Sequence, residues 1–409
     1  MKKKIFLILL IILLPCFVMA AEFGLVLNQY VDVGSSESEN MFVEYNALLV
    51  PRLLFLFDDS SGGNFLGSLF ISAGLNARYF ADELVYVPEL LRTELYLQWG
   101  SLGVSAGRFG YSTPLPFLID GLFDGVRFSY NSGLGNLSFG AWFTSLLYKK
   151  NIGIGMTETD RAINDVPLDY GNLTGTYFAP QRFLASFDWE NLAVADILRL
   201  NAALTAQMDL SRAVDSYNSQ YLSLKIGLPA GSIFFELGAI LSTGQTGSTN
   251  DFDMAFAGNV GIYWTLPTRF NSRIALNALY TSGQTNGLIG AFVPVTTSYA
   301  GDIFLARLTA LTVLDLDYLA RFNENFGINL NAKYFIRNDL VTDSSYNIAA
   351  PDDNGQLLGA EFYAGFSVTP VSDLNLNVGG GMFVPQLGNN WSTAIPLWLV
   401  KFALIFTFY

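Results

Sequence analysis

A regular alternation of apolar and polar side chains between residues 198 and 210 constrains the fold of this chain more than any other feature. One parity holds Leu198, Leu200, Ala202, Leu204, Ala206, Met208 and Leu210, and the other holds Arg199, Asn201, Ala203, Thr205, Gln207 and Asp209. Successive side chains of a β-strand point to opposite faces, so this stretch predicts a strand with one apolar and one polar face. It is also long enough to cross a bilayer as a tilted strand.

Similar alternation recurs along most of the chain and predicts about eighteen strands. Their expected ranges are 22–33, 41–57, 65–80, 90–100, 102–109, 125–131, 136–147, 182–190, 197–210, 219–228, 233–243, 254–266, 272–283, 309–322, 326–337, 357–369, 374–384 and 396–408. We therefore predict an all-β fold, a transmembrane antiparallel β-barrel with a lipid-facing apolar surface and a polar lumen. A large soluble all-β protein is the alternative.

The connections between these strands alternate in length. The short ones, such as 100–101, 229–232, 323–325 and 370–373, are rich in Asn, Asp, Gly, Pro and Ser, which form tight turns. The longer ones include 109–124, 148–181, 284–308 and 338–356. Outer-membrane barrels show this asymmetry, with short periplasmic turns and longer extracellular loops.

Composition favours strands over helices as the membrane-crossing elements. Of the 409 residues, 51% are hydrophobic and 14% are charged. Yet only the N-terminus holds an apolar run that approaches the length of a transmembrane helix. Alternation produces this combination because each lipid-facing residue is followed by one that faces the lumen.

The first twenty residues have the pattern of a secretory signal. Three lysines at 2–4 precede an apolar core at 5–14, and Val18-Met19-Ala20 provides small residues before a cleavage point. We expect residues 1–20 to be removed, which leaves 21–409 as a single barrel domain. An uncleaved helical anchor and a lipoprotein acylated on Cys16, the only cysteine, are alternatives.

Several kinds of chemistry are not expected. The sequence has no histidine, whereas barrel hydrolases generally need a histidine base and common zinc sites need histidine ligands. A net charge of −13 argues against nucleic-acid binding. We predict a protein that is not an enzyme, with no catalytic residues, no metal site and no cofactor.

The polar faces of the strands supply the candidate pore-lining residues. They are Arg78, Arg92, Glu94, Arg108, Arg127, Arg199, Gln207, Asp209, Lys225, Glu236, Arg273, Asp315, Asp317, Arg321, Lys333, Arg337, Glu361 and Lys401. This set leans basic although the chain is acidic, and basic rings in a pore favour anions. Alternatives are a wall of paired charges without selectivity and, for Asp315 and Asp317, a cation site.

The longest predicted connection runs from Tyr148 to Gln181. A porin loop of this length can fold inward and narrow the channel, in which case Lys149, Lys150, Asp160 and Arg161 would contact solute. The alternative is a loop exposed at the cell surface.

Two regions resemble the alginate-export family of outer-membrane porins and, more loosely, the neighbouring substrate-specific porins. The first runs from Leu102 to Arg108 and from Gly121 to Tyr130, a strand ending in Gly-Arg followed by a Gly-Val-Arg strand start. The second comprises Tyr280–Gly283, Phe292–Pro294 and Tyr299–Asp302. Together they cover under a third of the chain. The resemblance implies a monomeric barrel with a basic conduit for acidic sugars, and it implies that Arg108 and Arg127 are lumen cations.

The C-terminal strand ends in Phe408-Tyr409 and is similar to the signal that bacterial barrels present to their assembly machinery. The expected location is therefore the bacterial outer membrane, with the lipid bilayer, this machinery and small solutes as partners. We predict a porin for passive diffusion of small hydrophilic solutes, anionic or sugar-like. The alternative is a surface interaction protein that binds through its long loops with little transport. The polar lumen argues against a third function, uptake of hydrophobic solutes.

Overall fold

The computed structural model describes residues 18–35, 41–58, 65–80, 83–144, 146–194, 197–247, 252–284, 289–339, 355–388 and 395–408. The charged start, the apolar core and Cys16 of the predicted signal lie outside the described residues, as does the terminal Tyr409. Val18 to Ala20 form the beginning of the first strand. Within the described part, no helix combines the length and the apolar character needed to cross a bilayer.

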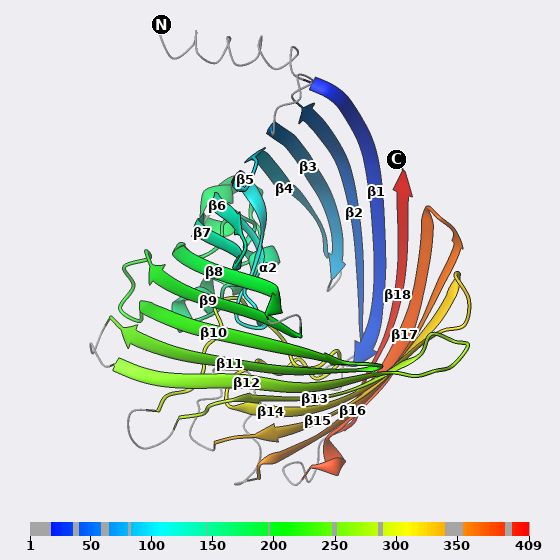
Figure 1. Cartoon of the computed structure of the whole chain (residues 1–409). Coiled ribbons are helices and arrows are strands. Elements are labelled where there is room, and N and C mark those ends of the chain that lie inside the picture. Colours follow the sequence, from blue (N-terminus) through cyan, green and yellow to red (C-terminus); the bar gives the residue numbers. More distant parts are fainter. Residues whose placement is uncertain are drawn as a thin grey trace, which may run out of the picture.

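The strands form one antiparallel sheet of 18 strands that closes on itself, because β1 pairs with both β2 and β18 (Figure 1). The predicted fold class and strand number are confirmed. The strands are β1 (Val18–Ser35), β2 (Met41–Asp58), β3 (Phe65–Phe80), β4 (Glu83–Trp99), β5 (Leu102–Ser112), β6 (Asp120–Ser132), β7 (Gly135–Phe143), β8 (Arg182–Val194), β9 (Leu198–Asp209), β10 (Tyr217–Ala230), β11 (Ile233–Thr246), β12 (Phe252–Thr265), β13 (Arg273–Thr281), β14 (Leu311–Arg321), β15 (Phe326–Arg337), β16 (Leu357–Val371), β17 (Leu374–Val384) and β18 (Leu397–Phe408).

The faces of β9 are those that the alternation predicts. Leu204 and Met208 are 54% and 53% exposed on the outer surface, whereas Gln207 is 1% exposed and faces inward. The inward residues continue across the ladder, since the Ser219 hydroxyl of β10 donates to Gln207 Oε1 at 2.9 Å. A closed ladder of this kind pairs backbone groups along most of the length of its strands, and hydrocarbon requires such pairing of a spanning sheet.

The strand boundaries around β4 and β5 differ from expectation. β4 begins at Glu83 rather than residue 90, and β5 and β6 extend so far that their connection shortens to 113–119. Acidic residues and Pro88 ordinarily indicate loops. Here Pro88 is tolerated because its backbone faces a side of β4 where no strand pairs with it.

Substitutions on the two faces of the wall test this geometry. Leu204→Arg places a charge against the hydrocarbon and should lower the free energy of unfolding by about 2–4 kcal/mol. Asn377→Arg, on the lumen side of β17, should change it by less than about 1 kcal/mol. Denaturant unfolding in lipid vesicles measures both, and equal destabilisation by the two variants would contradict the assigned faces.

Candidate functional site in the barrel interior

The loop between β7 and β8 folds into the barrel. It carries α2 (Lys149–Ile152), α3 (Glu158–Asp165), η2 (Tyr170–Asn172) and α4 (Leu173–Thr176). Ile152, Ile154 and Met156 are buried in one apolar cluster with the inward-facing Trp142 and Tyr221. The loop therefore packs inside the barrel, as the constriction hypothesis requires, rather than lying wholly at the surface.

A buried ion triad holds this loop to the wall. The Arg182 guanidinium, at the start of β8, donates to both Asp160 carboxylate oxygens at 2.8 and 2.6 Å and lies 2.7 Å from Asp209 Oδ1. All three side chains are at most 1% exposed. Burial raises the pKa of Asp160, although the Arg182 charge opposes this shift. Removal of one member of such a group leaves an uncompensated buried charge, which costs about 3–5 kcal/mol.

Two of the residues expected to contact solute instead stabilise the loop. Lys149 Nζ donates to the backbone carbonyls of Ile163 and Val166 at 2.8 and 2.7 Å and is buried. Asp160 caps α3 as well as pairing with Arg182, since it accepts from the Thr157 N–H at 3.0 Å. The expectation that Lys149 and Asp160 face solute is therefore wrong. Lys150 is exposed and Arg161 is half-buried.

A second connection, between β13 and β14, also folds inward. Glu361 of β16 is fully buried and accepts hydrogen bonds from the backbone N–H groups of residues 302, 303 and 304 at 2.8, 3.0 and 2.8 Å. Lys333 of β15 donates to Asp302 at 2.8 Å. The Phe304 ring then stacks on Phe383 with centroids 4.2 Å apart. Two of the predicted pore-lining residues, Glu361 and Lys333, therefore anchor a loop.

The interior is consequently less uniformly polar than predicted. Inward positions such as Phe109, Ile240 and Phe335 are apolar and buried against the inward-folded loops, in two clusters. The β5–β6 connection contributes Leu115 and Leu118 to the first cluster. An inward residue can be apolar wherever a loop, rather than water, covers it.

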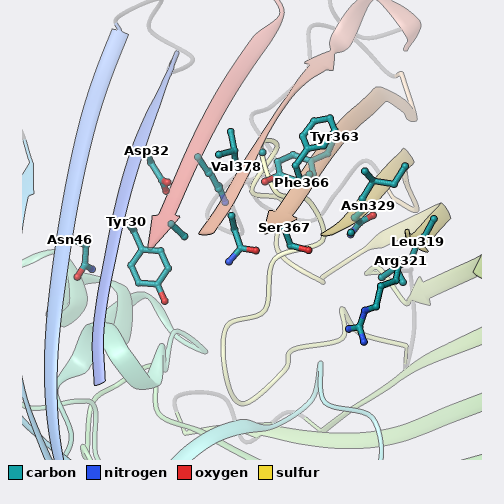
Figure 2. Close-up of a pocket in the computed structure, with 18 of the residues that line it drawn as sticks. Tyr30, Asp32, Asn46, Leu319, Arg321, Asn329, Tyr363, Phe366, Ser367 and Val378 are labelled. Carbon is teal, nitrogen blue, oxygen red and sulfur yellow. The ribbon is translucent and has the colours of Figure 1, made fainter. Parts of the chain in front are cut away.

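A cavity of about 570 Å³, lined by both polar and apolar groups, remains on the side of the barrel formed by β1, β2 and β14–β18. We call it the polar cavity after its charged and amide side chains. Its charged lining residues are Asp32, Glu44, Arg321 and Lys401. Lys401 lies opposite Asp32 in the β1–β18 register. Figure 2 shows Tyr30 and Arg321 extending into this space from different strands. The carboxylates, cations, amides and tyrosine hydroxyls of this lining can hydrogen-bond hydrated solutes.

The other predicted pore-lining residues are mostly paired across strands or stacked on aromatic rings. Asn331 Nδ2 donates to Asp315 and Asp317 at 2.5 and 2.9 Å. The ion pairs are Arg92 with Glu94, Lys225 with Glu236 at 2.9 Å, and Arg78 with Glu89 at 4.0 Å, while Arg127, Arg199 and Arg273 lie over Phe109, Phe234 and Tyr263. Arg108 and Arg337 are buried.

Among the described residues, sequence reasoning missed several charged side chains of the interior, including Asp32, Glu44, Glu89 and Arg182. The first two strands alternate poorly in sequence, which concealed Asp32 and Glu44. Arg182 lies an even number of positions from Ser186 and Asp188, so it shares their inward face of β8, and this spacing could have identified it. The added acids make the interior less basic than predicted. The described residues contain no cluster of His, Cys, Asp or Glu arranged to bind a metal ion.

No protein-family profile and no curated protein matches this chain, but solved structures match nearly all of it. Pseudomonas aeruginosa OpdQ is 11% identical with a TM-score of 0.63, and the match covers 96% of this chain and 99% of OpdQ. OpdK from the same organism, solved with vanillate, is 10% identical with a TM-score of 0.64, covering 96% and 99%. OccK2 (OpdF) in complex with glucuronate is 11% identical with a TM-score of 0.62, covering 96% and 98%.

These likenesses concern the fold. They support the looser of the two resemblances in the sequence, that to substrate-specific porins, and give no support to the alginate-export family. The chain has the 18-stranded barrel fold of the Pseudomonas substrate-specific outer-membrane porins.

Proposed function

We propose that this protein is an outer-membrane porin through which small hydrophilic solutes diffuse passively. The observation that carries the proposal is the polar cavity of about 570 Å³ inside a closed barrel whose outer surface is apolar. Such a wall excludes lipid from the interior and leaves a hydrated space along β14–β18, β1 and β2. The protein is a channel rather than an enzyme in this proposal.

The lining of the cavity favours solutes with hydroxyl groups and a carboxylate. Asn46, Tyr30 and Ser367 offer hydrogen bonds to hydroxyl groups, and Arg321 and Lys401 offer positive charge. A guanidinium is well suited to a carboxylate because its donors form a planar fork. OccK2 and OpdK were solved with glucuronate and vanillate, and both ligands carry a carboxylate. Asp32 and Glu44 limit the anion preference to a mild one.

The remaining expectations are part of the same proposal. Residues 1–20 direct export and are removed, and the barrel of residues 21–409 is inserted as a monomer by the assembly machinery through its C-terminal strand. The inward packing of the β7–β8 and β13–β14 connections weakens the alternative of a surface interaction protein, because these connections are held inside the barrel.

Planar-bilayer recording on the refolded protein tests the proposal. We expect discrete conductance steps and, across a salt gradient, a reversal potential that indicates a mild preference for anions. Insertion without conductance would contradict the porin function and favour the interaction protein. Clear cation selectivity would contradict the solute preference alone.

A charge reversal in the cavity tests which residues set selectivity. Arg321→Glu should shift the reversal potential toward cations, because the side chain lines the cavity and is exposed to it. The matched control is Arg269→Glu in the turn between β12 and β13, outside the cavity lining. An equal shift in the two variants would mean that overall charge, rather than the cavity, determines selectivity.

Release of the β7–β8 loop should widen the passage. Arg182→Gln leaves Asp160 and Asp209 buried without their cation, so we expect larger and noisier single-channel conductance. Deletion of residues 152–176 should have a stronger effect in the same direction. Arg199→Gln, on the neighbouring strand β9 and without such a pair, is the control. Unchanged conductance in both loop variants would remove the constriction role.

A further inference from the structure

The pairing between β4 and β5 stops partway up the wall. Their register runs only from Trp99 with Leu102 to Thr93 with Arg108. Beyond that point β4 still pairs with β3, and β5 still pairs with β6. The two strands therefore diverge, and Figure 1 shows them separating near α2. We call residues 86–90 of β4 and 108–112 of β5 the β4/β5 seam.

Side chains replace the missing backbone ladder along the edge of β4. The Tyr170 hydroxyl accepts from the Tyr86 N–H and donates to the Tyr86 carbonyl, both at 2.9 Å. The Tyr177 hydroxyl donates to the Pro88 carbonyl at 2.8 Å. Proline has no N–H, so this edge position leaves no donor unsatisfied. An unpaired backbone group in lipid costs several kcal/mol. The tyrosine hydroxyls satisfy the backbone of β4 where β5 does not pair with it, and such side-chain contacts can break without disturbing the neighbouring strand pairs.

Arg108 closes the end of the seam at which the pairing between β4 and β5 stops. It binds Asp124 through two hydrogen bonds of 2.9 and 2.8 Å, and it donates to the carbonyls of Leu90 and Leu146. The guanidinium is buried and its charge is balanced by the carboxylate. The resemblance implied a lumen cation at this position, whereas the side chain instead seals an unpaired strand edge.

A cavity of about 480 Å³ lies at the seam. Its apolar lining includes Leu90, Leu122, Leu147 and Ile152. Leu90 is 45% exposed, whereas the adjacent Glu89 is buried and accepts a hydrogen bond from Asn151. The cavity is therefore bordered both by a residue of the lipid-facing surface and by a residue of the interior.

The seam lies near the outer edge of the hydrocarbon. Trp99 is exposed at the periplasmic end of β4, and a tilted strand crosses the bilayer in about 9–11 residues. This places residues 86–90 at the level of the outer leaflet. Tyr86 and Leu84 extend the exposed apolar surface beside the seam.

We propose that the β4/β5 seam is a lateral portal through which a small uncharged amphiphile passes between the outer leaflet and this cavity. The apolar lining suits a hydrocarbon tail, and the Tyr148 and Tyr177 hydroxyls suit a hydroxyl head. Asp124 neutralises Arg108, which leaves Glu89 and Asp120 as the other charged lining residues. A carboxylate head is therefore disfavoured. This route does not depend on the polar cavity, because the two cavities share no lining residue.

Trp142 reports on occupancy of the cavity. Its ring stacks on Tyr111, a lining residue, with centroids 4.6 Å apart. In a protein whose other tryptophans are replaced by phenylalanine, reconstituted in lipid vesicles, 10-bromodecanol should quench Trp142 fluorescence saturably. The anion 10-bromodecanoate should need about tenfold more ligand for the same quenching, a difference of about 1.4 kcal/mol.

Two glycines provide matched variants. A Cβ at Gly110, in the seam cavity, would meet only the Gly121 carbonyl oxygen at 4.0 Å, so the Cβ of Gly110→Leu enters the cavity without a clash. This variant should raise the quenching midpoint about tenfold and leave conductance unchanged, which also verifies its fold. Gly365 lines the polar cavity, where a Cβ would meet Tyr363 at 3.5 Å. Gly365→Leu should lower conductance and leave quenching unchanged.

The contacts of Tyr170 and Tyr177 with the edge of β4 are tested separately. Tyr170→Phe combined with Tyr177→Phe removes the two hydroxyls that satisfy the β4 edge, and it should accelerate quenching several-fold in stopped-flow mixing with alcohol-loaded vesicles. Quenching that rises linearly without saturation, or that is identical in Gly110→Leu, would overturn the binding site. An unchanged rate in the double variant would overturn the portal. Neither result depends on whether the barrel conducts ions.

Discussion

The interaction on which this structure depends is the backbone hydrogen bond in a medium without water. Hydrocarbon offers no alternative partner to an N–H or C=O group, so a spanning sheet has to close. The pairing of β1 with β18 closes it. Closure then separates two environments, and the side-chain alternation of each strand follows from this separation. Where the ladder stops, between β4 and β5, side chains from an inward-folded loop supply the missing partners.

The barrel interior is shaped by loops rather than by the wall alone. Two buried groups, Arg182 with its two aspartates and Glu361 with three backbone N–H groups, hold connections against the inside of the sheet. These connections cover apolar inward residues in two clusters, and a cavity remains beside β14–β18, β1 and β2. The chemistry of the proposed passage is that of the residues of β14–β18, β1 and β2 that line this cavity.

Local sequence predicts the features that depend on neighbouring residues. The alternation at 198–210 correctly assigns Leu204 and Met208 to the outside and Gln207 to the inside, and turn composition separates short from long connections. Contacts between distant segments are not encoded in this way. Lys333 and Glu361 have the parity of pore-lining residues, yet a loop 31 positions from Lys333 and 58 from Glu361 in sequence makes them anchors.

The same limit explains Arg108 and the apolar interior. The resemblance of the Gly-Arg strand end implied a pore residue at Arg108, because the sequence does not show that β4 separates from β5 at this position. Inward-facing residues such as Ile240 are apolar, although the alternation predicts polar residues there, because an inward-folded loop covers them. Most of these errors concern what covers a face, whereas Arg108 shares the outward face of β5 with the exposed Leu102.

The central claim is that a hydrated passage crosses the barrel beside the inward-folded loops. Osmotic swelling of vesicles that contain the refolded protein tests it most directly, with uncharged sugars of increasing size as solutes. The account predicts rapid swelling in a pentose and progressively slower swelling as the sugar approaches the size of a tetrasaccharide. Absence of swelling in the pentose, with the barrel correctly inserted, would contradict it.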